Sequence, residues 1–157
     1  MTVRHPMLTW LLAASALLLS GICRAEIPLE ATQTLDKLHG YAASADWDNY
    51  FALYTEDAHF IGTDATENWN MEEFSAYARP TKGWHYTLVS RQLQQHGDVI
   101  VFDEHLSSKS YGNCRGTGTL VLTPEGWKIL QYHLSFPIPN AMAKRITAQI
   151  SAASQKE

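Results

Sequence analysis

The chain has 157 residues, of which 45% are hydrophobic and 18% are charged, and its formal net charge is −4 at pH 7. This composition fits one globular domain and excludes a disordered chain or a multidomain enzyme. The negative charge offers no bulk attraction to nucleic acid or anionic lipid, so neither is an expected partner.

The first 25 residues have the pattern of a secretory signal peptide. Arg4 precedes an uncharged apolar run over residues 7–22, and Cys23 and Ala25 place small side chains at the −3 and −1 positions of a cleavage site. The run is shorter than the roughly 20 residues that a bilayer-spanning helix needs. We therefore predict export, to the periplasm in preference to full secretion, with cleavage between Ala25 and Glu26 and no stable membrane insertion afterwards. An uncleaved N-terminal anchor is the alternative.

The remaining sequence is expected to form one domain over residues 26–140, followed by a C-terminal helix and polar tail over 141–157. No linker, repeat or low-complexity tract divides the domain in the sequence. A domain of this length buries about two-thirds of its surface, which is enough for a core without disulfides. Cys114 is the one cysteine left after the predicted cleavage, so no intramolecular disulfide is expected.

Apolar spacing predicts helices in the first half of this domain. Apolar residues three or four apart indicate a helix over 26–45 and a short second helix after Asp46. Capping-box signatures follow at Asp64–Glu67 and Asn70–Glu73, and the second opens a helix that ends before Pro80. A short strand is expected over 58–62. An aromatic stripe on the second helix is expected in the core: Trp47, Tyr50, Phe51 and Tyr54.

The second half changes to a period of two, which predicts strands. They are expected over 84–95, 98–107, 111–123 and 126–136, and Asn140 is placed to cap a final helix. Helices therefore come first and an antiparallel meander comes last. This order indicates an α+β fold.

Four strings in this order resemble the SnoaL-like branch of the nuclear transport factor 2-like superfamily. They are Tyr50–Tyr54, Phe60–Trp69, Tyr111–Gly116 and Trp127–Ser135, and the last has the pattern Trp-x-Ile-x-x-x-His-x-Ser. The resemblance implies a cone-shaped barrel made of a curved, mostly antiparallel sheet with N-terminal helices packed on its concave face. It also implies a homodimer that forms through the outer face of the sheet. It implies no particular chemistry, because members include isomerases, cyclases, dehydratases and non-catalytic binding domains.

The turn Thr123-Pro-Glu-Gly126 predicts which side chains share a face of the last two strands. If Thr123 faces Trp127, one face carries apolar residues near the turn and polar residues further along. The apolar residues are Trp127 and Ile129, and the polar ones are Arg115, Thr117, Thr119, Gln131, His133 and Ser135. Such a face suits a small-molecule pocket and is expected to line the cavity. The alternative is that this face is solvated and the opposite, apolar face is the core.

Four residues of the predicted strands have candidate roles. His133 is the first candidate for proton transfer, since imidazole exchanges a proton near neutral pH, with a structural role as the alternative. Asp103 and Glu104 are adjacent on one strand and point to opposite faces, so only one of them can face the cavity and act as a base. Arg115 can hold a ligand carboxylate, or it can pair across the hairpin with Glu104 or Asp103.

Asp64, Glu67 and Trp69 are expected at the mouth of the cavity, and Trp69, Trp84 and Tyr86 are expected to form an aromatic wall. Helix capping is the alternative explanation for Asp64, and the core is the alternative place for the three aromatic residues. The histidines are dispersed along the sequence, and neither a metal-binding spacing nor a dinucleotide-binding fingerprint is present. Neither a metal nor a cofactor is therefore expected.

These observations predict an exported protein that binds a small, partly apolar molecule with a carboxylate or carbonyl group. One alternative is a cofactor-free acid/base enzyme of the isomerase, dehydratase or hydrolase type, which uses His133 with Asp103 or Glu104. Another is a dimerising assembly module whose cavity is vestigial.

Overall fold

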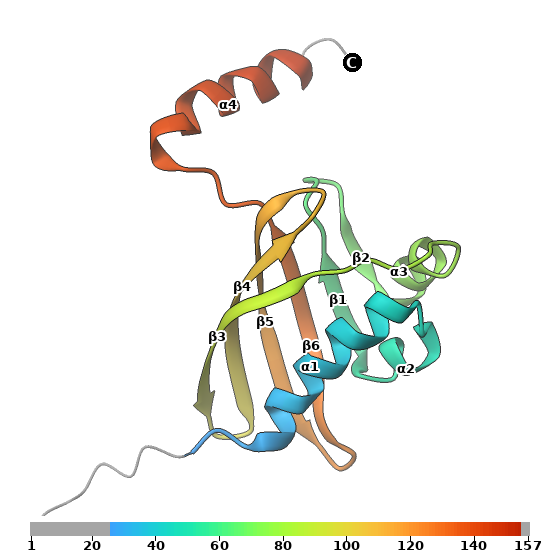
Figure 1. The fold of residues 1–157 in the computed structure, drawn as a ribbon. Helices are drawn as coiled ribbons and strands as arrows, with labels where there is room; N and C mark the ends of the chain where they lie inside the picture. Colours follow the sequence, from blue (N-terminus) through green and yellow to red (C-terminus); the bar gives the residue numbers. More distant parts are fainter. Residues whose placement is uncertain (1–25, 155–157) are drawn as a thin grey trace, which may run out of the picture.

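A computed structural model describes residues 26–154, so the signal-peptide prediction lies outside the described residues. Helices predominate in the first half of the described residues and strands in the second half (Figure 1). They are α1 (Leu29–Ser44), α2 (Trp47–Phe51), β1 (Tyr54–Ile61), β2 (Asn68–Asn70), α3 (Met71–Ala78), β3 (Thr87–His96), β4 (Val99–Ser108), β5 (Gly112–Thr123), β6 (Gly126–Ser135) and α4 (Asn140–Ser154).

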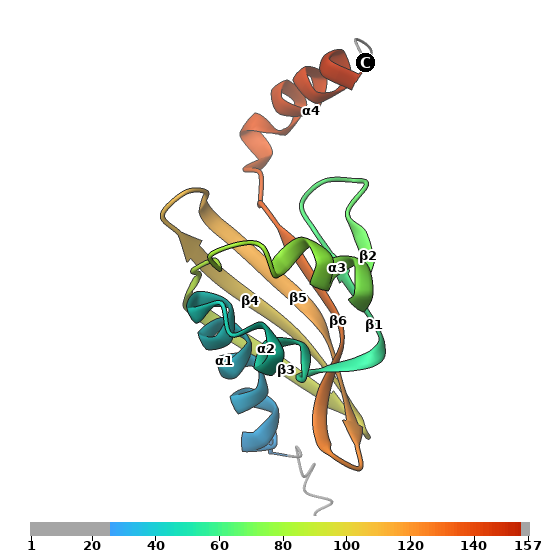
Figure 2. The same cartoon turned by 90° about the vertical axis from the view of Figure 1, so that its right-hand side faces the viewer.

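The six strands form one curved sheet in the order β2-β1-β6-β5-β4-β3. All neighbouring pairs are antiparallel except β1 and β6, which run parallel. Figure 2 shows α1, α2 and α3 on the same side of the sheet, which is its concave side. The α+β prediction is confirmed, and the sheet is curved but unclosed, with β2 and β3 at its edges.

Local hydrogen bonds explain where α3 begins. Asn70 Oδ1 accepts a bond from the Glu73 amide at 2.9 Å, and Glu73 Oε2 accepts one from the Asn70 amide at 3.0 Å. This reciprocal pair is the predicted capping box. The similar Asp64–Glu67 signature forms a turn instead of a helix, because the Asp64 carboxylate bonds to Thr66 two residues on. The turn leads into β2, a strand that the sequence pattern did not indicate.

The core lies between α1, α2, α3 and the concave face of the sheet. The apolar stripe of α1 is buried there, and Leu35 and Ala31 are completely covered. Burying one leucine side chain stabilises the fold by about 1.5–3 kcal/mol. Trp47, Tyr50 and Tyr54 are also buried, so the prediction of an aromatic core is confirmed for these three residues.

The register of β5 and β6 differs from the predicted one near their turn. Thr123 pairs with Gly126, and Leu120 pairs with Ile129, so the first pairs are shifted by one residue. An irregularity at Leu130 then inserts one residue into β6 and restores the predicted pairs, as a β-bulge does. Because one residue reverses the facing, Ile129 points to the concave side and Gln131 to the convex side. The prediction that Trp127, Ile129, Gln131 and His133 share a face is therefore wrong.

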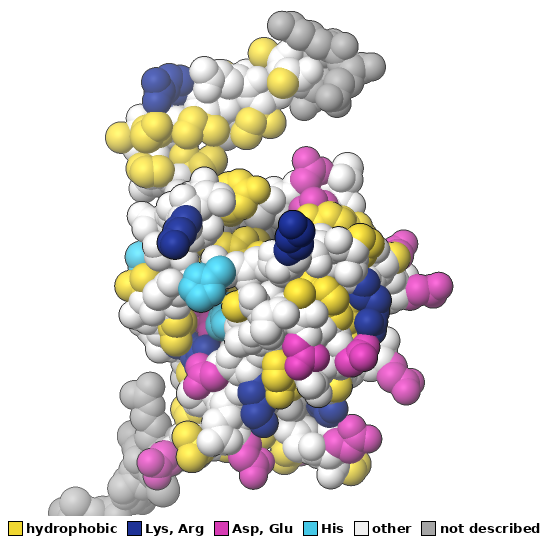
Figure 3. Space-filling view, turned by 45° about the vertical axis from the view of Figure 1, so that its right-hand side comes forward, with side chains coloured by type: hydrophobic (Ala, Val, Ile, Leu, Met, Phe, Trp, Pro, Cys, Tyr) yellow, Lys and Arg dark blue, Asp and Glu magenta, His cyan; other side chains and the backbone are white. Residues whose placement is uncertain are grey.

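The last helix, α4, stands apart from the sheet. It begins beyond the end of β6, after a segment with Pro137 and Pro139 (Figures 1 and 2). Hydrophobic side chains follow the side of this helix that is turned toward the domain (Figure 3). Among residues 26–154, no helix has the length and apolar character to cross a membrane.

Candidate functional site

A cavity of about 370 Å³ opens on the concave side of the sheet, between β1, β2, α3, the segment before β3, and the end of β6. We call it the outer cavity. Its walls are largely aromatic, and Thr63, Glu67 and Thr81 add polar groups. The aromatic residues in its lining are Phe60, Trp69, Phe74, Tyr77, Trp84, Tyr86, Tyr111 and Phe136.

The rings around Phe60 lie nearly parallel to one another. Phe60 stacks on Phe74 with 3.9 Å between ring centroids, on Trp69 with 6.2 Å, and on Tyr132 with 5.9 Å, at interplanar angles of 18°, 16° and 10°. Offset stacking of this kind favours flat partners. Phe60, Trp69 and Phe74 are also part of the lining, so this parallel stack borders the outer cavity.

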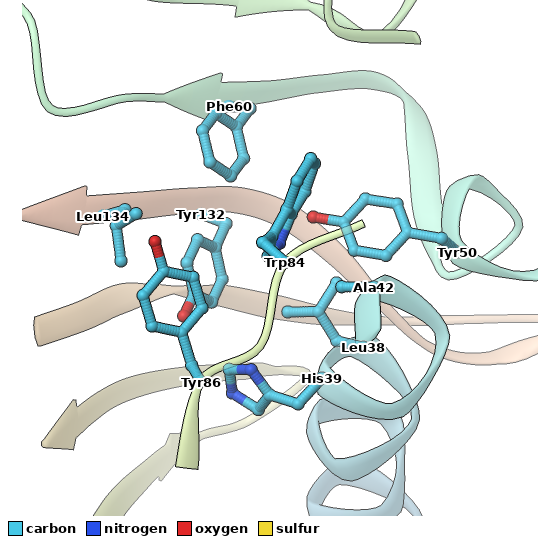
Figure 4. Close-up of a pocket in the computed structure, with 9 residues that line it drawn as sticks. All are labelled: Leu38, His39, Ala42, Tyr50, Phe60, Trp84, Tyr86, Tyr132 and Leu134. Atoms are coloured by element: carbon cyan, nitrogen blue, oxygen red, sulfur yellow. The ribbon is translucent and has the colours of Figure 1, made fainter. Parts of the chain in front are cut away.

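A second, much smaller space adjoins the outer cavity, and we call it the inner chamber. Its volume is about 20 Å³, which is enough for one water-sized group. It shares Phe60, Trp84, Tyr86 and Leu134 with the outer cavity. Figure 4 shows its lining, with Phe60 at one end and His39 at the other; the further members are Leu38, Ala42, Tyr50 and Tyr132.

A buried carboxylate lies behind His39. Glu104 is completely covered, and each of its oxygens has a partner. Arg91 Nε donates to Oε1 at 2.7 Å, Tyr132 Oη donates to Oε2 at 3.1 Å, and His39 Nε2 lies 2.8 Å from Oε2. Burial alone raises the pKa of Glu104, but the hydrogen bond and charge of His39, followed by those of Arg91, outweigh it and lower the pKa. Glu104 is therefore a carboxylate at neutral pH.

Arg91 extends this network to α1. Its Nη1 atom donates to Asp36 Oδ1 at 2.7 Å and to the Thr32 carbonyl at 3.3 Å. Within the described part of the chain, its buried Nη2 atom has no hydrogen-bond partner. A buried ion pair is tolerated only where further hydrogen bonds satisfy its atoms, and the contacts to Glu104, Asp36 and Thr32 do so for the rest of the guanidinium. The network therefore joins α1, β3, β4 and β6 directly below the inner chamber.

The tyrosines of the site are uncharged hydrogen-bonding groups. Burial raises the pKa of Tyr86 to about 12, and it also raises the pKa values of Tyr50 and Tyr132 well above their ordinary range. The hydroxyls of Tyr50 and Tyr54 are hydrogen-bonded to each other at 3.0 Å. The tyrosine hydroxyls can therefore meet a neutral polar group of a ligand but carry no charge of their own.

The predicted strand residues lie on the other side of the sheet. Thr117 pairs with His133, Arg115 with Ser135, and Asp103 with Thr117, so these side chains share the convex face. The prediction that Arg115, Thr117, Gln131 and His133 line the cavity is wrong. On β5, Arg115 and Thr117 alternate with buried residues such as Cys114, and on β6 the bulge at Leu130 puts Gln131 and His133 on the face opposite Ile129. The alternative, that the apolar face is the core, is confirmed by the burial of Cys114, Leu120 and Tyr132.

The two adjacent carboxylates divide as expected, one to each face. Asp103 lies on the convex face and forms an ion pair with Arg115 at 3.1 Å, both side chains being about half exposed. This contact is one of the two cross-hairpin pairs that the sequence left open for Arg115. Glu104 faces the concave side and is the carboxylate below the inner chamber.

The remaining predicted residues lie near the mouth of the cavity. Trp69, Trp84 and Tyr86 are part of its lining, whereas Asp64 lies in the adjoining turn. Hydrogen bonds from the side chain and amide of Thr66 lower the pKa of Asp64 and occupy one of its oxygens. Glu67 lines the cavity at this place.

Sequence reasoning missed His39, Arg91 and Tyr132 as site residues. His39 follows Leu35 by four positions, on the buried face of the first helix, and a titratable group at such a place was the available signal. Arg91 likewise alternates with Leu93 on the inward face of its strand. Within residues 26–154, no three His, Cys, Asp or Glu side chains are grouped so that they could hold a metal ion.

A curved α+β sheet with a helix-covered aromatic cavity defines a class of small domains with cone-shaped interiors. Residues 31–139 match the SnoaL-like domain, and the chain belongs to that family. No curated protein matches the sequence.

Solved structures share the fold. One is a nuclear transport factor 2-like protein of unknown function from Pseudomonas putida KT2440, with 15% identity, a TM-score of 0.60, and coverage of 71% of this chain and 87% of that one. Another, from Parabacteroides distasonis and provisionally named a ketosteroid isomerase, has 19% identity, a TM-score of 0.59, and coverage of 73% and 90%. A protein of unknown function from Pectobacterium atrosepticum has 24% identity, a TM-score of 0.60, and coverage of 69% and 89%. At these identities the likeness shows the fold alone.

Proposed function

We propose that the protein binds a small, flat, neutral molecule in the outer cavity. The observation that carries this proposal is the stack of nearly parallel rings formed by Phe60, Trp69 and Phe74, which line a cavity of about 370 Å³. Ligand pockets combine apolar walls with a few placed polar groups and have volumes of about 300–1,000 Å³. This cavity lies near the small end of that range.

The charges of the lining narrow the class of ligand. Among the described residues, the lining of the outer cavity includes Glu67 and no Lys or Arg. Arg115, the group expected to hold a ligand carboxylate, lies on the convex face. A ligand carboxylate would have no cationic partner in the cavity, whereas a carbonyl or hydroxyl can bond to the neutral hydroxyl of Tyr86.

Binding of two matched probes tests this proposal. We expect 2-naphthol to bind measurably by titration calorimetry and 2-naphthoate to bind at least tenfold more weakly, because its charge is unpaired. Trp69→Leu removes one stacking face and should weaken naphthol binding about fivefold, the equivalent of roughly 1 kcal/mol. Val89→Ala, at an exposed position of β3 outside the cavity lining, serves as the matched control. Saturable binding of neither probe, or an equal loss in both variants, contradicts the proposal.

Export and dimerisation are further parts of the proposal. The leader pattern over 1–25 supports export, and the exposed Val99 and Val101 on the convex face support a dimer through that face. Expression of the full chain followed by native mass spectrometry of the exported fraction tests both. The expected species is a dimer of chains that begin at Glu26. A full-length chain contradicts the cleavage, and a monomer contradicts the dimer.

A further inference from the structure

The inner chamber places an imidazole against a buried carboxylate at the end of an aromatic cavity. From the contact of His39 Nε2 with Glu104 Oε2 and the position of His39 in the chamber lining, we propose that His39 is a catalytic base for a ligand held in the outer cavity. The inference rests on the proposed binding function and extends it to a reaction. It replaces His133, which lies on the convex face, as the proton-transfer residue.

The hydrogen bonds fix the orientation of the imidazole. When the Nε2–H group of neutral His39 donates to Glu104, Nδ1 carries the lone pair and is the basic atom. Among residues 26–154, the hydrogen bond of the His39 side chain is the one that Nε2 makes, which leaves Nδ1 free for a ligand. Glu104 is itself held by Arg91 and Tyr132, so it acts as a positioning residue that keeps the tautomer and stabilises the imidazolium once a proton has been taken.

The size of the chamber restricts what can reach His39. About 20 Å³ admits one water-sized group, so a ligand in the outer cavity can present an edge to the imidazole but not a second ring. The substrate class is therefore a flat, neutral, unsaturated molecule with an acidic C–H bond at its edge. The reaction class is removal of that proton, which needs no oxidant, reductant or second substrate.

The probe 5-nitrobenzisoxazole matches this class, since it is flat and neutral and has one acidic C–H bond at its edge. His39 Nδ1 takes the proton from C3, the C–H electron pair completes the C≡N triple bond, and the N–O bond breaks. The phenolate oxygen leaves with the electron pair of the broken N–O bond, and the imidazolium returns its proton to water. The product is a coloured cyanonitrophenolate, so absorbance follows each turnover.

The groups that surround His39 determine whether another side chain could take the substrate proton instead. They are Glu104 from β4, Arg91 from β3, Tyr132 from β6 and Tyr86 from the segment before β3. Glu104 is ionised, Arg91 is cationic, and both tyrosines stay neutral because burial raises their pKa values. Arg91 and the two tyrosines hold their protons, so none of the three competes with His39 for the substrate proton.

The test compares the exported wild-type protein with three variants. His39→Gln keeps an amide donor for Glu104 but has no basic nitrogen, and it should lose about 100-fold or more in kcat. Glu104→Gln should lower kcat and leave KM unchanged, as expected of a positioning residue. His96→Ala, an exposed histidine at the end of β3, is the matched control and should equal the wild type. Circular dichroism confirms that each variant is folded.

The outcomes separate this inference from the proposed function. Tryptophan fluorescence measures binding of the probe independently of turnover, because Trp69 and Trp84 line the cavity. Binding without turnover, or equal turnover in His39→Gln and the wild type, overturns the catalytic role and leaves the binding function in place. Absence of both probe and naphthol binding overturns both.

Discussion

A carboxylate on the concave face of the sheet and a carboxylate on the convex face lie in opposite environments. Asp103 and Glu104 are neighbours on β4, and each meets an arginine, yet the Asp103 side chain is 50% exposed and the Glu104 side chain is 0% exposed. On the convex face the result is a solvated ion pair, which contributes little to stability. On the concave face it is a network of three partners that joins a helix to three strands and places a histidine at the end of a cavity. The two carboxylates therefore differ through their burial and not through their residue type, and the buried one, Glu104, is the one that belongs to the candidate site.

The largest expected effect comes from removing the buried carboxylate. Glu104→Ala leaves Arg91 buried without its main partner, and breaking one side of a buried ion pair costs about 3–5 kcal/mol of the free energy of unfolding. Urea unfolding monitored by circular dichroism measures this loss. A loss below about 1 kcal/mol would show that Glu104 contributes no more to the free energy of unfolding than an exposed carboxylate such as Asp103.

A methyl group added to the concave face should lower the free energy of unfolding somewhat less than Glu104→Ala does. Gly118 lies on β5 where a Cβ atom would meet the carbonyl oxygen of Gln131 and the ring of Phe102. Gly118→Ala should destabilise the protein by about 1–3 kcal/mol, because the backbone of β6 must move. Gly40→Ala is the control: Gly40 is exposed on α1 with open space around it, and the change should stabilise the protein by about 0.5–1 kcal/mol. Destabilisation by both changes to the same extent contradicts this view of the packing.

Acid should weaken the concave network. Because the pKa of Glu104 is lowered by folding, the stability it contributes is complete above the ordinary carboxyl pKa and is lost as the pH falls through the lowered value. The free energy of unfolding should therefore decline below about pH 5, and Glu104→Gln should flatten that decline. Urea midpoints between pH 7 and pH 3 measure both slopes. Identical slopes in the two proteins would show that groups other than Glu104 cause the loss of stability in acid.

The smallest effect is expected on the convex face. Asp103→Ala breaks an exposed pair with Arg115 and should change the free energy of unfolding by at most about 1 kcal/mol. Added salt should erase even that difference, because exposed charges are screened. Urea unfolding at low and high ionic strength is the measurement. A large loss that persists in salt would mean that the convex face is covered, as in the proposed dimer.

Most of the fold could be predicted because its signals are local. The Asn70–Glu73 capping box, the Asp46 cap and the aromatic stripe of α2 each span a few residues, and the structure contains all three. The strand β2 was missed because three residues, Asn68–Asn70, are too short to show a period of two. The family resemblance, confirmed over residues 31–139, supplied the architecture that local patterns do not specify.

The site was harder to predict, for two physical reasons. A single inserted residue reverses the facing of a strand, and no feature of the sequence around Leu130 indicates a bulge there. The central contact also joins distant positions, since His39 and Glu104 are 65 residues apart. Only tertiary packing brings such residues together. Glu104 was identified as one of two candidates, but the sequence alone could not say which of Asp103 and Glu104 faces inward.

The parallel pairing of β1 with β6 has a consequence for the order of folding. The hairpins β3–β4, β4–β5 and β5–β6 close over short turns, whereas β1 meets β6 through pairs such as Tyr54 with Ile129, so it must close a long loop at a higher entropic cost. The meander can therefore assemble first, with its apolar face uncovered until α1 and β1 dock. That waiting period is when a newly made chain is most open to aggregation or to capture by a chaperone. In this order of folding the cavity forms only in the last step, when α1 and β1, which are synthesised first, pack against the strands that are synthesised later.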